Sequence, residues 1–88
     1  MRYQDHCRRC EQALGKDWGV VHRWMDEFAR TGGTMMGTHR VYRHHREGIE
    51  EVRAKWGDEA ADAAELHVFD DFGFIPTKAE LEEMFGMK

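Results

Sequence analysis

Apolar residues recur every three or four positions along most of this chain, and that spacing predicts helices. A weak helical pattern covers residues 3–14, where Gly15 can end the helix. A second helix is expected over residues 18–30, with Asp17 as its N-cap. Its apolar face carries Trp18, Val21, Met25 and Phe28.

The third predicted helix contains half of the histidines in the chain. Three glycines within residues 31–37 indicate a loop, and Thr38 can cap a helix over residues 38–56. Gly48 inside this helix costs roughly 1 kcal/mol relative to Ala. We therefore expect another backbone or a ligand to approach closely there. The apolar face carries Val41, His45, Ile49, Val52 and Trp56.

An alanine-rich fourth helix is predicted over residues 58–72, with small side chains that let a neighbouring helix come close. Thr77 with Glu80 forms a capping-box pattern for a short final helix that Gly86 ends. No alternating strand pattern is present. One face of the fourth helix carries Ala60, Ala64, His67 and Asp71. The expected fold is all-α, a single domain over residues 1–88 with four helices and a short C-terminal helix.

The composition of the chain is typical of a small folded domain. The chain has 88 residues, of which 41% are hydrophobic and 34% charged, as in a small folded domain. No apolar run approaches the roughly 20 residues that span a bilayer, and the N-terminus lacks the apolar region of an export signal. We therefore expect a cytoplasmic protein without membrane association. Its core is small, so a metal or a second subunit would stabilise it.

Charge is divided unevenly along the chain. Residues 1–57 hold eleven Lys and Arg against eight Asp and Glu, whereas residues 58–88 hold two against nine. A basic half can indicate a nucleic-acid partner. We favour the alternative that the acidic half pairs with the basic half, within the fold or across a homodimer.

Two segments share the pattern H-x-x-x-D: His22 with Asp26, and His67 with Asp71. On a helix this spacing puts an imidazole and a carboxylate on one face. Each pair could bind a metal, or its Asp could orient its His, or it could be an ordinary hydrogen-bonded surface pair. The repetition of the pattern favours a site.

Two further histidines join this hypothesis. His39 and His44 lie about 140° apart around a regular helix, so both face one metal only if His39 sits at the helix start. His45 is better explained as a core histidine with a hydrogen-bond partner. Imidazole and carboxylate ligands suit Zn, Fe, Mn or Ni, among which zinc is our expectation. The predicted metal ligands are His22, Asp26, His39, His44, His67 and Asp71.

Cys7 and Cys10 form a CxxC, a spacing that in a cytosolic chain indicates metal or redox chemistry. With His6 they could form a second, structural zinc site, for which a fourth ligand is not evident. Arg40 and Arg43 could bind a phosphate beside the metal, because guanidinium matches phosphate bidentately. Their alternative role is pairing with the acidic half.

The segments HRVYRHHREGI and ELHVFDDFGFIPT resemble an uncharacterised family of small bacterial and phage proteins, a domain of unknown function. The resemblance covers roughly residues 17–85 and implies no activity. This sequence has Leu66 where the family pattern has Gln. The matching positions are His22, Trp24 and Asp26, then His39, Arg40, His44, Gly48 and Ile49, then His67, Val68, Asp71, Gly73, Ile75, Pro76 and Thr77.

Two functional hypotheses follow from these patterns. The first is a small metal-binding protein that, if catalytic, hydrolyses a phosphoester through a metal-activated water. A weaker similarity to helical metal-dependent phosphohydrolases points the same way, although Val68 replaces the adjacent Asp of their His-Asp pair. The alternative is a non-enzymatic module that binds a protein partner or sequesters a small anionic ligand.

Overall fold

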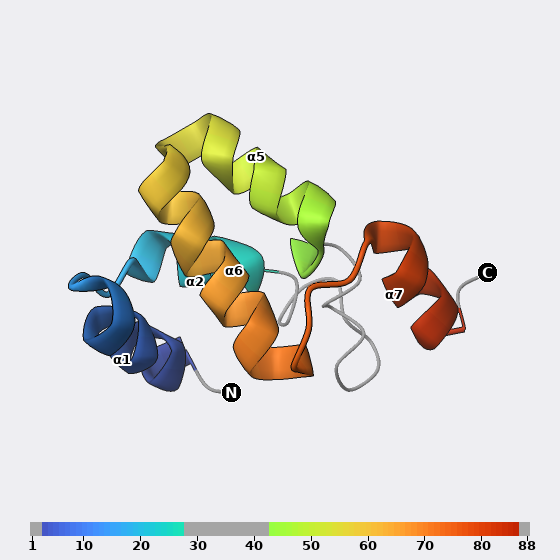
Figure 1. Cartoon of the computed structure of the whole chain (residues 1–88), viewed down its shortest axis with the longest axis horizontal. Coiled ribbons are helices and arrows are strands. Elements are labelled where there is room, and N and C mark those ends of the chain that lie inside the picture. Colours follow the sequence, from blue (N-terminus) through green and yellow to red (C-terminus); the bar gives the residue numbers. More distant parts are fainter. Residues whose placement is uncertain (1–2, 28–42, 87–88) are drawn as a thin grey trace.

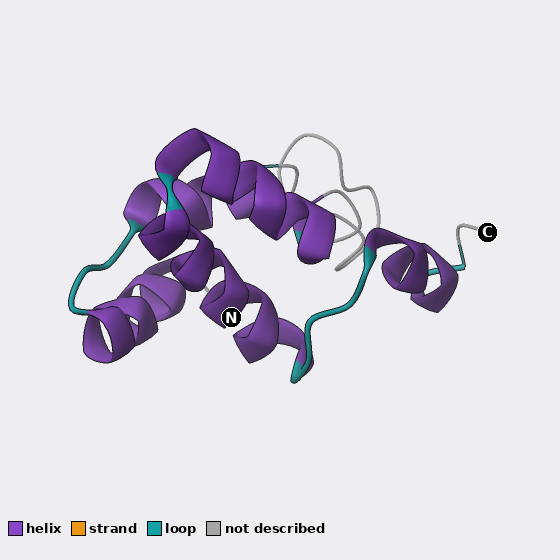
Figure 2. Cartoon of the chain, turned by 45° about the horizontal axis from the view of Figure 1, so that its top comes forward, coloured by secondary structure: helices purple, strands orange, loops and turns teal. Residues whose placement is uncertain are grey.

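The computed structural model describes residues 3–27 and 43–86 of the chain. These residues form five helices and no strand, which confirms the all-α prediction (Figures 1 and 2). The helices are α1 (Tyr3–Leu14), α2 (Gly19–Met25), α5 (Arg46–Trp56), α6 (Asp58–Phe72) and α7 (Lys78–Met84).

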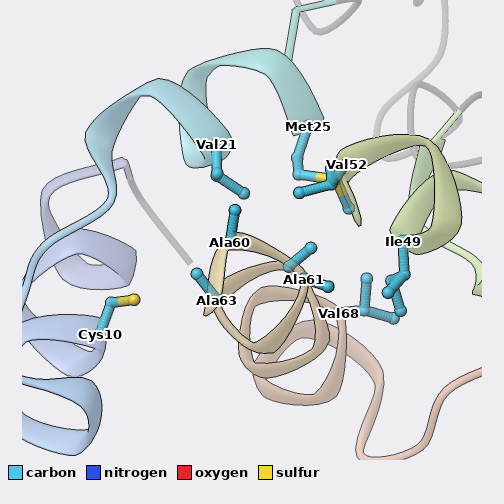
Figure 3. Packing of buried hydrophobic residues seen from close by; sticks show 10 residues of the cluster. Cys10, Val21, Met25, Ile49, Val52, Ala60, Ala61, Ala63 and Val68 are labelled. Atoms are coloured by element: carbon cyan, nitrogen blue, oxygen red, sulfur yellow. The ribbon is translucent and has the colours of Figure 1, made fainter. Parts of the chain in front are cut away.

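Helix α6 is the element against which the others pack. Figure 1 shows α5 and α6 joined by a tight turn at Gly57, with α2 and α1 on another side of α6. Four alanines of α6 have no exposed surface, so the neighbouring helices approach its backbone closely, as predicted. Figure 3 shows Ala60 near Val21 of α2, and Ala61 on the side of Val52 of α5. The buried cluster consists of Cys10, Val21, Met25, Ile49, Val52, Ala60, Ala61, Ala63, Ala64 and Val68.

Local signals set most of the helix ends. The predicted bounds of α1 and α6 are confirmed, and Gly73 ends α6 with φ 79°, a conformation that favours glycine. The capping box is also confirmed. Thr77 Oγ1 accepts a hydrogen bond from the Glu80 N–H, and the Glu80 side chain accepts one from the Thr77 N–H.

The prediction of one continuous helix from Thr38 to Trp56 is wrong in its described part. Helix α5 begins at Arg46, and His45 is its N-cap. The Gly48 N–H donates to His45 Nδ1 at 2.9 Å, in place of the carbonyl of His44 that a continuing helix would use. His44 and His45 therefore lie in a turn. The predicted loop 31–37 and the cap at Thr38 lie outside the described residues.

The expected close approach at Gly48 is confirmed, and the approaching group is backbone. A Cβ at this position would lie 2.0 Å from the carbonyl oxygen of Arg43. The chain just before α5 therefore folds across the first turn of that helix, a path that only glycine permits. This path positions His44, the residue that follows Arg43.

The second helix is shorter than predicted. It ends at Met25 instead of residue 30, and Asp26 is its C-cap with φ −99° and ψ 11°. The Glu27 N–H bonds to the carbonyl of Trp24, three residues back, which tightens the last turn. Asp26 therefore lies just beyond the helix that carries His22.

The segment that leads to α7 is tied to the start of α5. The Arg46 N–H donates to the carbonyl of Pro76 at 2.9 Å, and the Lys78 N–H donates to the Glu47 carboxylate at 3.0 Å. Helix α7 lies far from α1, at the other end of the molecule in Figure 1. Among the described residues, no helix has the length and apolar character needed to cross a membrane.

Candidate metal centre

Four histidines from different parts of the chain meet in the interior. His67 comes from α6, His22 from α2, His44 from the turn before α5 and His6 from α1. Each of these side chains has at most 1% of its surface exposed. Asp71 lies one turn beyond His67 on α6, as its spacing predicted. Its side chain is 2% exposed.

On one side of His67, four potential metal ligands converge. His44 Nε2 lies 2.9 Å from His67 Nε2, 3.2 Å from Asp26 Oδ1 and 3.3 Å from Asp71 Oδ2. His67 Nε2 lies 3.4 Å from the same Asp26 oxygen and 3.7 Å from the Asp71 oxygen. All four ligand atoms lie within 4.8 Å of one another. These two imidazoles and two carboxylates are positioned to hold a metal ion.

The spacing of these atoms matches a coordination sphere. At metal–ligand bonds of about 2.1 Å, neighbouring ligand atoms lie about 3.4 Å apart around a tetrahedral ion and about 3.0 Å apart at right angles. The observed separations between ligand atoms, from 2.9 to 3.7 Å, span both values. The ligands can therefore close around one ion with little movement.

The surroundings of the two imidazole pairs at His67 differ. The rings of His44 and His67 meet at 63°, with centroids 4.7 Å apart, and oxygens of Asp26 and Asp71 lie 3.2 to 3.7 Å from their Nε2 atoms. The rings of His22 and His67 differ by only 21°, with centroids 5.1 Å apart. Yet the facing nitrogens are 2.9 Å apart in both pairs. The contact between His22 and His67 has the length of an N–H···N hydrogen bond.

The contact with His22 suits an orienting role. It occupies Nδ1 of His67, which leaves Nε2 of the same ring for the converging cluster. Histidines that bind metals usually donate a hydrogen bond from their other ring nitrogen, which fixes the tautomer and the ring orientation. His22 can accept that bond through its Nδ1. The sequence pattern had assigned His22 to the metal itself.

His6 lies against the face of His67. The two rings are stacked, with centroids 3.5 Å apart and planes 15° apart. His6, His22 and His67 form a second group of nitrogens within 4.8 Å of one another. Their three rings are nearly parallel, so their lone pairs do not converge on one point. This second group therefore fits a metal poorly.

The contacts of His6 differ from those of the other histidines. Its Nε2 lies 3.4 Å from Asp71 Oδ1, a contact without hydrogen-bond geometry, and its Nδ1 has no hydrogen-bond partner among the described residues. The sequence pattern had grouped His6 with the cysteines. Its spacing of four from the buried Cys10 is the signal that could have placed it on the inner face of α1.

The electrostatics favour ionised carboxylates beside neutral imidazoles. Burial opposes the ionisation of Asp26, but contacts with His44 and His67 outweigh it and hold its pKa below the ordinary value. The pKa of Asp71 is likewise lowered, since contacts with His44 and His6 outweigh burial. Burial lowers the pKa of His67 to about 3 and that of His22 to about 4. Neutral imidazole and ionised carboxylate are the forms that bind metals.

The other residues that the sequence suggested for a site do not join this cluster, as far as the structure describes them. Arg43 donates to the carbonyl of Trp24 at 2.7 Å and to Glu27 at 3.1 Å, so it contacts the end of α2. Cys7 and Cys10 are free thiols, and neither joins a group of three potential ligands in the part of the chain that is described. His39 and Arg40 lie outside the described residues.

The fold and the cluster together define a small all-α protein with a buried histidine–aspartate centre. The whole chain, residues 1–88, matches the family described as a domain of unknown function, DUF6915, and the protein belongs to that family. The resemblance to an uncharacterised family is thereby confirmed, and it extends beyond residues 17–85. Its bacterial or phage origin stays a prediction. No curated protein and no solved structure matched the chain.

Proposed function

We propose that this protein binds one divalent metal ion, zinc by preference, through Asp26, His44, His67 and Asp71. The observation that carries the proposal is the convergence of their four ligand atoms, at separations of 2.9 to 3.7 Å where measured, in the interior of the fold. Two nitrogens and two oxygens form a donor set that suits zinc, and also iron or manganese.

Charge supports the same assignment. The two carboxylates have lowered pKa values and are ionised at neutral pH, so they contribute a charge of about −2 to the cluster. One divalent metal ion would balance the charge of these two carboxylates. His67 is neutral at neutral pH, because burial lowers its pKa, and a proton need not leave its Nε2 before the ion binds.

We further propose that the bound ion serves hydrolysis of a phosphoester. The separations between ligand atoms, 2.9 to 3.7 Å, would allow five- or six-fold coordination as well as tetrahedral, and the higher coordination numbers would keep positions for water or substrate. Asp26 is 24% exposed, so one side of the cluster is near solvent. A divalent ion there would polarise a phosphoryl oxygen and lower the pKa of water. Water would add to phosphorus as the ester P–O bond breaks, and its proton would end on the alcohol released.

The alternative is a binding module with a structural metal. If the ion is tetrahedral, the four side chains fill its coordination and no position remains for substrate. The protein would then act through its surface, on a protein partner or a small anionic ligand. Metal content, coordination number and hydrolysis of a simple phosphoester together distinguish the two functions.

The test compares two neighbouring aspartates on α6. Asp71→Asn removes a ligand charge, whereas Asp70→Asn makes the same chemical change at a residue that pairs with Arg9 at 3.4 Å. Tag-free protein should contain close to one equivalent of metal, and Asp71→Asn should lose it while Asp70→Asn keeps it. Metal at 100 times its dissociation constant should stabilise the parent by about 2.7 kcal/mol, a shift of roughly 10–20 °C.

Elemental analysis, and thermal unfolding with and without chelator, measure these effects. Parent protein without stoichiometric metal, and without a thermal shift on adding zinc, iron or manganese, would show that the cluster is a hydrogen-bonded core. Metal present, but with four protein ligands by X-ray absorption and no hydrolysis of phosphoesters, would leave the binding module as the function.

A further inference from the structure

A surface cavity adjoins the cluster at its solvent side. Its volume is about 780 Å³, within the range that small-molecule sites occupy. Asp26 belongs both to the lining of this cavity and to the converging cluster. The other lining residues come from α1, from α2 and Glu27 just beyond it, and from the last residue of α5. A molecule in the cavity would therefore lie beside the ion that Asp26 helps to hold.

One cation of the lining is fixed in place. Arg23 donates a hydrogen bond to Tyr3 Oη at 3.0 Å, and its guanidinium lies 5.4 Å from the centre of the Tyr3 ring. A guanidinium has five N–H donors, and this bond to tyrosine uses one of its nitrogens. The others can bind a phosphate, for which the planar group is well shaped. Arg23 was not among the arginines that the sequence pattern had selected.

Another part of the lining is aromatic. Trp24 and Trp56 meet edge to face, with centroids 6.1 Å apart, and 36% of the Trp56 surface remains exposed. Arg43 stabilises this wall, because its guanidinium lies 3.9 Å from the centre of the Trp24 ring. Flat apolar groups pack favourably against such rings. The exposed Val20, at 50%, adds further apolar surface.

The charges of the lining fit an anion once the ion is bound. Arg43 pairs with Glu27 at 3.1 Å, and the ion offsets the carboxylates of Asp26 and Asp71. Arg23 then remains as the positive charge of the cavity wall. A small phosphate ester could bind to both Arg23 and the metal ion, whereas tight binding of a nucleic-acid backbone would need many more cationic contacts.

We propose that this cavity binds the substrate, a small phosphate ester with a flat aromatic group. Its phosphate lies between Arg23 and the metal beside Asp26, and its aromatic group packs on Trp56. This inference rests on the proposed metal-dependent function, and it assigns the substrate class and two residues that recognise it.

Binding of phenyl phosphate and methyl phosphate to metal-loaded protein tests the assignment, by calorimetry and by tryptophan fluorescence. Phenyl phosphate should bind roughly 5- to 10-fold more tightly than methyl phosphate, because only its ring reaches the aromatic wall. Arg23→Gln should weaken both ligands by roughly 10- to 100-fold. Trp56→Leu should weaken phenyl phosphate alone and remove the preference between them.

A matched control is available on α5. Arg53 is a partly exposed arginine that pairs with Glu50 and Asp58 and does not line the cavity, so Arg53→Gln should leave both affinities unchanged. Arg23 is exposed, and its replacement should leave the fold intact, as circular dichroism would check. Metal-loaded protein that binds both ligands equally, or binds them independently of Arg23, would overturn this inference alone. A parent that binds no metal would overturn the proposed function and this inference with it.

Discussion

The two nitrogens of His67 face two different kinds of site. At Nε2, His44, Asp26 and Asp71 approach from three directions, and their ligand atoms converge. At Nδ1, the neighbour is Nδ1 of His22, while His6 stacks on the face of the ring. The distances between facing nitrogens are the same, 2.9 Å, on both sides. The carboxylate oxygens beside Nε2, and not the distance between imidazoles, separate a metal-binding arrangement from a supporting one.

This difference has a simple physical origin. A metal ion attracts lone pairs from several directions at once, whereas a hydrogen bond joins one donor to one acceptor along a line. The carboxylates of Asp26 and Asp71 group with Nε2, whereas the other group of potential ligands found among the described residues, at His67, consists of the imidazoles of His22 and His6. We therefore expect one ion for each chain, held on the Nε2 side.

The largest effect that we expect from these histidines is a loss of folding stability at acidic pH in the metal-free protein. His22 and His67 have folded-state pKa values of about 4 and about 3, against 6.5 in an exposed imidazole. Below pH 6.5 the unfolded chain binds more protons than the folded chain, so folding loses stability as pH falls toward 4. The loss between pH 7 and pH 5 should be a few kcal/mol.

Urea unfolding of the chelated protein at pH 7, 6 and 5 measures this loss. The lowered pKa values of the two aspartates act in the same direction, but only below about pH 4, where an unfolded carboxylate takes up a proton. Stability that stays level from pH 7 to pH 5 would contradict the lowered pKa values of His22 and His67.

The next effect concerns the hydrogen bond at Nδ1. His22→Leu removes the acceptor that orients His67 and should weaken metal binding by about 10- to 100-fold. His22→Gln retains an acceptor and should recover much of the affinity. His45→Asn is the control, since it replaces another buried histidine by a residue that can also cap α5. Competition with a chromophoric chelator gives the affinities, and equal values for His22→Leu and the control would remove the orienting role.

The smallest effect should come from the stacked ring. His6→Phe keeps a flat ring against His67 but removes two buried nitrogens that make no hydrogen bond among the described residues. Metal affinity should change less than about tenfold, below the range for groups that orient ligands. Thermal stability should stay level or rise, since an unsatisfied buried polar group is costly. Two metal ions in the parent and one in His6→Phe would instead make His6 a ligand of a second ion.

The sequence determined the parts of this protein that depend on near neighbours. Residues 3–14 and 58–72 form the predicted helices, since their apolar spacing and flanking glycines are local signals. The capping box at Thr77 has the same origin. The H-x-x-x-D spacing put His67 and Asp71 on one face of α6, because i and i+4 are neighbours on any helix.

Tertiary structure decided the start of α5 and the meeting of the ligands. The carbonyl of Arg43 lies against Gly48. The imidazole of His45 accepts the hydrogen bond from the Gly48 N–H, which the carbonyl of His44 would accept in a continuous helix. No local pattern specifies this turn, which delivers His44 to the cluster. The sequence indicated that histidines and aspartates were present in pairs. Which imidazole nitrogens meet the carboxylates depends on how α1, α2, α5 and α6 pack, and that meeting distinguishes a ligand from its support.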